Sequence, residues 1–198
     1  PAIRNSKALD ELSLKAGNYF LVSTHREENV DNRANLEKIL TVLDGLAIEY
    51  GMPVIVSTHP RTRKRLEELK DYKADSLIRF MKPFGFLDYN FLQMNARCVL
   101  SDSGTISEES AILSFPAISL RQSMERPEAQ DAGTIILTGF DPSVVVSSIR
   151  LVIRQFKENG KYKEIPQDYS IQNTSWRVLK LISGNTRLSN LWHGIRNN

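Results

Sequence analysis

Three polar segments of the chain carry residue types that can bind a phosphate or move a proton. The first, residues 24–29 (THREEN), places His25 next to Arg26. A guanidinium can hold a phosphate through two hydrogen bonds, and an imidazole can donate or accept a proton near neutral pH. The alternative for His25 is a solvated side chain on a polar loop, which is the commoner situation for an isolated histidine.

The second segment, residues 101–105 (SDSGT), runs directly into a predicted helix. Such a turn forms an anion site, because free N–H groups and the helix dipole meet there and the Ser103 and Thr105 hydroxyls add donors. Glu109 is expected about one turn into the helix, placed to accept hydrogen bonds from sugar hydroxyls. An ordinary helix N-cap is the alternative. The segment lacks the Gly-Lys-Ser/Thr of a phosphate-binding loop and the G-x-G-x-x-G pattern of a dinucleotide-binding turn. It also lacks G-x-S-x-G, the pattern of a hydrolase nucleophile elbow.

The third segment, residues 121–128 (RQSMERPE), contains Arg126 as a further candidate partner for a phosphate or a carboxylate. Pro127 can begin a helix. The alternative is a surface ion pair of little energetic value.

Six short segments are apolar on both faces, which is typical of buried parallel strands. They are residues 19–23, 53–57, 77–81, 98–101, 117–120 and 134–137. Amphipathic stretches separate them, and this alternation predicts βαβ units and an α/β fold with a doubly wound, Rossmann-like parallel sheet. Ligands of such sheets bind at the carboxyl ends of the strands, where the three polar segments lie.

A polar stretch over residues 158–170 marks the expected end of this domain. We expect a Rossmann-like domain over residues 1–165, and then a linker, a helix and a tail over residues 166–198. The helix is predicted over residues 174–182 and would bury Trp176, Val178 and Leu179. From Ser183 onward the tail is polar and expected to be poorly ordered. The chain starts at Pro1 without a methionine, as a piece of a longer protein would.

Composition excludes several classes of protein. With 41 % apolar and 25 % charged residues the 198-residue chain is globular rather than disordered, and its single Cys98 rules out a disulfide framework or a cysteine-based zinc module. A net charge of +3 is too small to indicate a nucleic-acid partner. No apolar run approaches the roughly 20 residues of a membrane span, and no signal peptide opens the sequence. We therefore expect a cytoplasmic protein without a membrane partner, a metal site or a cofactor.

Taken together, the three segments resemble the non-hydrolysing UDP-N-acetylglucosamine 2-epimerase family. The matching stretches are THREEN at residues 24–29, SDSGTISEE at 101–109 and ERPEA at 125–129. The resemblance extends over about residues 19–182. It implies two Rossmann-like domains in a GT-B arrangement with the active site between them, and a homodimeric enzyme. This chain would be the carboxyl-terminal, UDP-binding domain, and the amino-terminal domain would be its partner.

The resemblance also implies roles for individual residues. His25 would be the catalytic residue, close to the diphosphate. The residues implied to bind UDP are Arg26, Tyr89, Ser103, Gly104, Thr105, Glu109 and Arg126. Among these the turn holds the diphosphate, Glu109 holds the ribose hydroxyls and Tyr89 lies near the uracil.

The implied reaction removes the C2 proton and eliminates UDP, and then UDP adds back and C2 is protonated on the opposite face. The bases would lie on the amino-terminal domain, so this chain alone would be inactive. Thr105 and Met124 stand where many members have Gly and Thr, as in subfamilies that act on modified sugars for capsule and O-antigen assembly. The sugar therefore stays open between UDP-N-acetylglucosamine and a modified relative. A GT-B glycosyltransferase domain and a non-catalytic nucleotide-binding module are the alternative functions.

Overall fold

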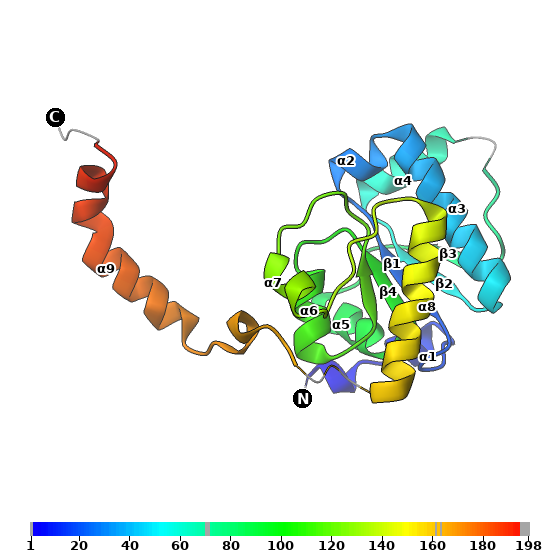
Figure 1. Cartoon of the computed structure of the whole chain (residues 1–198). Coiled ribbons are helices and arrows are strands. Elements are labelled where there is room, and N and C mark those ends of the chain that lie inside the picture. The colour runs from blue at the N-terminus through cyan, green and yellow to red at the C-terminus, as the bar shows by residue number, and fades with distance from the viewer. Residues whose placement is uncertain (1, 70–71, 161, 163, 195–198) are drawn as a thin grey trace. The chain divides into compact units, whose positions relative to one another are not determined.

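The computed structural model describes residues 2–69, 72–160, 162 and 164–194. Its centre is a parallel sheet of five strands in the order β3-β2-β1-β4-β5 (Figure 1). The strands are β1 (Phe20–Ser23), β2 (Val54–Ser57), β3 (Ile78–Met81), β4 (Cys98–Ser101) and β5 (Ala117–Ser119). The chain builds β1 to β3 towards one edge and then returns to add β4 and β5 on the other side of β1. This is the predicted doubly wound, Rossmann-like sheet, with its switch point between β1 and β4.

The predicted sixth strand is wrong. Residues 134–137 contribute a single bridge, between Ser119 and Leu137. The backbone N–H and the hydroxyl of Thr134 both donate to the carbonyl of Ala129, at 2.9 and 3.1 Å, which holds the start of the segment in a turn. Beyond it, the backbone N–H groups of Thr138 and Gly139 donate to the carbonyls of Ser119 and Arg121 at 3.0 and 2.9 Å, and Gly139 has a φ of 62°.

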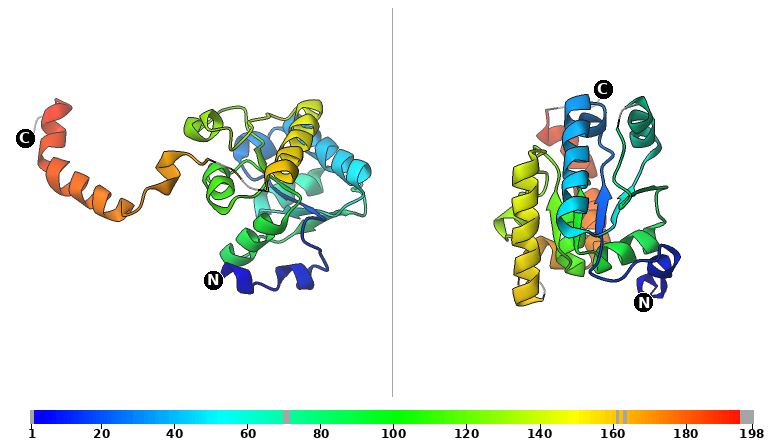
Figure 2. Two further views of the ribbon diagram at one scale, coloured as in Figure 1. Left: turned by 60° about the horizontal axis from the view of Figure 1, so that its bottom comes forward. Right: turned by 90° about the vertical axis from the view of Figure 1, so that its right-hand side faces the viewer.

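Helices connect the strands and cover both faces of the sheet. They are α1 (Ala8–Glu11), α2 (Glu27–Val30), α3 (Arg33–Tyr50), α4 (Pro60–Glu68), α5 (Phe86–Asn95), α6 (Ile106–Leu113), α7 (Pro127–Asp131) and α8 (Pro142–Asn159). Helices α3 and α8 lie side by side on one face, and α5 and α6 are on the other (Figure 2). The side of the core under α3 and α8 is built from alternate strand residues, such as Val22 and Leu100, and from the apolar stripes of the two helices.

Local sequence features set the start of one long helix and the end of another. Asp141 caps α8 by accepting hydrogen bonds from the backbone N–H groups of Ser143 and Val144, at 2.9 and 3.2 Å, and Pro142 takes the first helical position. Helix α3 ends at Gly51, whose φ of 58° closes the last turn in the left-handed region.

The chain divides into two units, Pro1–Pro166 and Gln167–Asn198. The second contains a short 3₁₀ helix (Gln167–Ser170) and α9 (Thr174–Trp192). The expectation of a poorly ordered tail is wrong as far as Trp192, because the helix continues ten residues beyond Ile182 and no proline interrupts it. Residues 195–198 lie outside the described residues.

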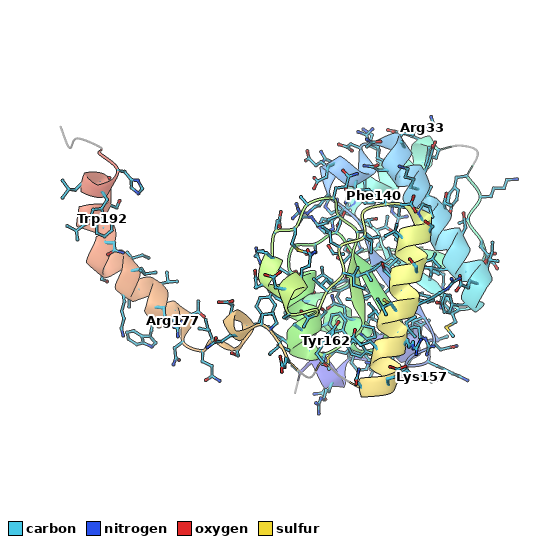
Figure 3. The ribbon with its side chains drawn as sticks, in the orientation of Figure 1. Arg33, Phe140, Lys157, Tyr162, Arg177 and Trp192 are labelled. Carbon is cyan, nitrogen blue, oxygen red and sulfur yellow. The ribbon has the colours of Figure 1, made fainter. Side chains whose placement is uncertain are left out.

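Helix α9 carries an extensive exposed apolar surface. Trp176, Val178 and Leu179, which were expected to be buried, are 63, 46 and 50 % exposed. Side chains project from the helix along its length, between the labelled Arg177 and Trp192 (Figure 3). Leu181, Ile182, Leu188 and Leu191 are exposed as well. In the described part of the chain no helix is both long and apolar enough to cross a membrane.

Candidate functional site

The strand register brings four serines to one edge of the sheet. Ser57, Ser23, Ser101 and Ser119 are successive partners at the carboxyl ends of β2, β1, β4 and β5. The three polar segments found in the sequence leave the sheet from the last three of these positions. The structure therefore brings them together at the carboxyl edge of the sheet, as predicted, and the switch point between β1 and β4 lies at this edge.

A buried carboxylate joins the first two segments. Asp102 has no exposed side-chain surface, and its Oδ2 accepts hydrogen bonds from the backbone N–H groups of His25 and Arg26, both at 3.0 Å. Asn29 Nδ2 donates to the same oxygen at 2.7 Å. Sequence reasoning did not assign Asp102 a role; its position directly after the wholly buried strand β4 was the available signal.

The His25 ring lies against this carboxylate. Nδ1 of His25 is 3.3 Å from Oδ1 of Asp102, and the His25 side chain is 44 % exposed. When Nδ1–H faces a carboxylate, the imidazole keeps Nε2 available to accept a proton. The ring centroid of His59, which caps α4, is 6.3 Å away. The Asp102 carboxylate thus orients the His25 ring, and the ring remains accessible to solvent.

The turn between β4 and α6 is held by its own hydroxyl groups. Ser103 N–H donates to Ser101 Oγ at 3.1 Å, and the hydroxyls of Ser103 and Thr105 are 3.0 Å apart. Helix α6 begins at Ile106. The predicted arrangement of a small turn leading into a helix N-terminus is confirmed.

Both carboxylate oxygens of Glu109 are held in place. Oε1 accepts from Thr105 Oγ1 at 2.8 Å, and Oε2 accepts from Gln93 Nε2 at 2.7 Å. Gln93 comes from α5, is fully buried, and was missed by sequence reasoning because nothing in the motif marks it. These two contacts fix Glu109 one turn into α6.

Tyr89 lies one turn before Gln93 on α5. Burial raises the pKa of its hydroxyl, and side-chain hydrogen bonds with Ser23 and Ser101 act in the opposite direction. Tyr89 is therefore at the same sheet edge, next to the ends of β1 and β4.

Three arginines converge on the turn, each paired with a carboxylate. Arg26 Nη2 and Arg121 Nη2 donate to the two oxygens of Glu125, at 3.0 and 2.7 Å. Arg126 Nε donates to Glu108 Oε1 at 2.6 Å. The hydrogen bond from Arg121, and then the charges of Arg121 and Arg26, hold the pKa of Glu125 at about 2. Arg121, only 6 % exposed, was not singled out in the sequence.

Gly104 allows these groups to approach the turn. A Cβ at this position would lie 2.7 Å from Glu125 Oε2 and 3.6 Å from Arg26 Nη2. The space among Gly104, Ser103, Arg121 and Arg126 is a cavity of about 10 Å³. Among the described residues no three His, Cys, Asp or Glu side chains are grouped so as to hold a metal ion.

Comparisons with known proteins point to one family. A family model described as UDP-N-acetylglucosamine 2-epimerase matches residues 2–183. The UDP-N-acetylglucosamine 2-epimerase of Methanocaldococcus jannaschii is 36 % identical over 163 residues, which are 81 % of this chain and 43 % of that protein. The chain spans about half the length of the curated relatives it matches.

Solved structures show the same relationship. A UDP-N-acetylglucosamine 2-epimerase from Rickettsia bellii aligns with a TM-score of 0.82 and 39 % identity, over 96 % of this chain and 50 % of that one. The Methanocaldococcus jannaschii enzyme in complex with UDP-GlcNAc and UDP aligns with a TM-score of 0.77 and 30 % identity, over 91 % of this chain and 49 % of that one. An Escherichia coli ADP-heptose heptosyltransferase, at 13 % identity and a TM-score of 0.57, shares the fold alone. On the match over residues 2–183 and the identity to these relatives, the chain belongs to the UDP-N-acetylglucosamine 2-epimerase family.

Proposed function

We propose that this chain is the UDP-binding half of an enzyme that inverts C2 of UDP-N-acetylglucosamine or of a closely related modified UDP-hexosamine. The observation that carries the proposal is the convergence of the turn at residues 103–105, the helix N-terminus of α6 and three arginines at one sheet edge. Family membership supports it, since a relative that aligns over 91 % of this chain was solved with UDP-GlcNAc and UDP.

In this proposal the diphosphate lies over Gly104. It accepts hydrogen bonds from the Ser103 hydroxyl and from the backbone N–H groups of Thr105 and the start of α6, since the one Thr105 hydroxyl proton is donated to Glu109. Arg26 and Arg126 neutralise its charge. Such donors stabilise a leaving group best when they are fixed before the reaction, because no reorganisation is then needed as charge develops. The hydrogen bonds within the turn supply this rigidity.

The other residues contact the rest of the nucleotide and the sugar. Glu109, held by Thr105 and Gln93, accepts hydrogen bonds from the ribose hydroxyls, and Tyr89 lies near the uracil. His25 Nε2 faces the diphosphate. In the imidazolium form it can donate its Nε2 proton to UDP as UDP leaves, and the neutral imidazole can take that proton back when UDP returns. Asp102 keeps the imidazole in the tautomer that this transfer requires.

We propose further that the C2 bases lie on an amino-terminal domain and that α9 packs against that domain. The exposed apolar side chains of α9 support this contact, since an apolar surface of this extent marks an interaction site. The family relationship supports a cytoplasmic, homodimeric enzyme that supplies a sugar for polysaccharide synthesis.

Ligand binding to this chain tests the nucleotide assignment. Calorimetric titration should show the highest affinity for UDP, a lower affinity for UMP and the lowest for uridine, because each phosphate adds contacts with the turn and the arginines. Ser103→Ala should weaken UDP and leave uridine unchanged, whereas Ser147→Ala, on α8, should change neither. No binding at millimolar UDP, or equal affinity for UDP and uridine, contradicts the proposal.

Isotope exchange tests the reaction. When the amino-terminal domain is present, the enzyme should introduce solvent deuterium at C2 of a UDP-hexosamine. Transfer of the sugar to an acceptor without exchange at C2 would instead identify a glycosyltransferase.

A further inference from the structure

The Glu125 carboxylate occupies a position with the chemistry of a phosphate site. Its two oxygens each accept a hydrogen bond from a different guanidinium, Oε1 from Arg121 at 2.7 Å and Oε2 from Arg26 at 3.0 Å. Two oxygens of one phosphate would bridge the same two groups in the same way. Oε2 also lies against the bare backbone of Gly104, at the position where any Cβ would collide with it.

Arg121 shows that this position is built for an anion. Its side chain is 6 % exposed, and its Nε has no hydrogen-bond partner among the described residues. The guanidinium lines the cavity of about 10 Å³ beside Ser103 and Gly104, a space that holds about one water and no phosphate. A diphosphate that reaches Arg121 must therefore take the place of the carboxylate.

Displacement of Glu125 is sterically easy. Its side chain is 41 % exposed and belongs to the irregular segment between β5 and α7. The carboxylate can therefore rotate into water, whereas Arg121 stays in place because it is buried.

We propose that Glu125 is an internal competitor for the diphosphate position and that it makes the site selective for ligands with several negative charges. A monoanion that displaces Glu125 exchanges one negative charge for another and gains little. A diphosphate brings additional charge and oxygens to Arg26, Arg121 and the turn, and so outcompetes the carboxylate. The low pKa of Glu125 keeps this competitor ionised at every physiological pH. This inference rests on the proposed function for the identity of the ligand.

Glu125→Gln tests the competition, since it keeps the shape of the side chain and removes its charge. Titration of the chain with inorganic pyrophosphate and with UDP should show dissociation constants about 1.5-fold to fivefold lower than in the wild type, the effect expected when an exposed ion pair no longer competes. Uridine affinity should not change. Glu125→Ala should also lower the dissociation constants of pyrophosphate and UDP, which would show that the effect does not depend on the glutamine side chain.

Glu49→Gln is the matched control. Glu49 pairs with Arg150 at 2.9 Å through each of its oxygens, and this pairing lowers its pKa as well, but the pair bridges α3 and α8 away from the site. This variant should bind both anions as the wild type does.

The outcomes separate the two proposals. Unchanged or weaker binding of pyrophosphate and UDP by Glu125→Gln, in protein whose melting curve remains cooperative, overturns the competition and would make Glu125 a ligand-binding group or a bystander. If the wild-type chain binds pyrophosphate as tightly as UDP, the nucleotide assignment is contradicted instead. The competition by Glu125 is then still tested by comparing pyrophosphate binding to the wild type and to Glu125→Gln.

Discussion

Removing the Asp102 carboxylate should destabilise the first unit much more than removing an ordinary loop carboxylate. In Asp102→Ala three donors lose their acceptor: the backbone N–H groups of His25 and Arg26 and the Nδ2 of Asn29. A donor left without a partner inside a protein costs about 1–3 kcal/mol. The size of the effect therefore depends on how far water can reach each of the three.

The exposure of each residue sets the estimate. Asn29 is 2 % exposed, and its remaining contact with the Leu120 carbonyl is long at 3.4 Å, so its amide bears the full penalty. The His25 and Arg26 amides belong to residues with more exposed side chains, so each contributes near the lower limit. Together the three predict a loss of about 3–5 kcal/mol in the free energy of unfolding.

Urea unfolding followed by far-ultraviolet circular dichroism measures this loss. Tryptophan fluorescence is unsuitable, because Trp176 and Trp192 are the two tryptophans of the sequence and both lie in α9. Asp75→Ala is the control, since the exposed Asp75 accepts a single backbone hydrogen bond, from Leu77 at 2.8 Å. It should cost about 1 kcal/mol.

An Asp102→Ala variant no less stable than Asp75→Ala would refute the reasoning. It would mean that the His25 and Arg26 loop does not depend on this carboxylate and that the donors find other partners. Asp102→Asn then separates stability from chemistry. Its amide keeps one acceptor oxygen for the loop, but its NH₂ group donates to His25 Nδ1 and reverses the tautomer, so turnover of the complete enzyme should fall while UDP affinity persists.

Three further predictions concern other parts of the chain. Glu125 has a folded pKa of about 2 against an ordinary 4.5, so the stability it contributes is complete above pH 4.5 and is lost as the pH falls towards 2. The free energy of unfolding, measured as a function of pH, should therefore fall less over this interval in Glu125→Gln than in the wild type. Gln93→Leu frees one oxygen of Glu109, and titration should show UDP binding about threefold to tenfold weaker with pyrophosphate unchanged, because pyrophosphate has no ribose. Trp176→Ala should leave UDP affinity unchanged and weaken association with the amino-terminal domain, measured by calorimetry; equal association would argue against α9 as the contact.

Local patterns predict the sheet well because parallel strands buried on both faces must be short apolar runs. The run at residues 134–137 meets the same criterion and yet forms a single bridge, since a turn between Thr134 and Ala129 decides its path. That turn depends on a hydrogen bond between side chain and backbone that periodicity does not detect. For helix α9 the sequence predicted too little regular structure. The polar second half of the helix indicated a tail, although no residue in it stops a helix.

The candidate site divides in the same way. His25, Ser103 and Glu109 could be predicted because each follows a recognisable strand, and parallel strands end at one edge. Their partners could not. Gln93 belongs to a different helix. Glu125 meets Arg26 across 99 positions of sequence and meets Arg121 through an irregular loop whose path no pattern specifies.

Burial separates these partners into two functional kinds. Asp102 and Gln93 have no exposed surface, so they cannot move away and instead fix His25 and Glu109 in one orientation. Glu125 and Glu108 are 41 and 31 % exposed, so they can leave their arginines when a stronger anion arrives. Removing a buried partner should therefore weaken nucleotide binding, turnover or stability, whereas removing an exposed one should tighten the binding of phosphates. The sign of the effect follows from the burial of the carboxylate or amide, although all four side chains contact the same site.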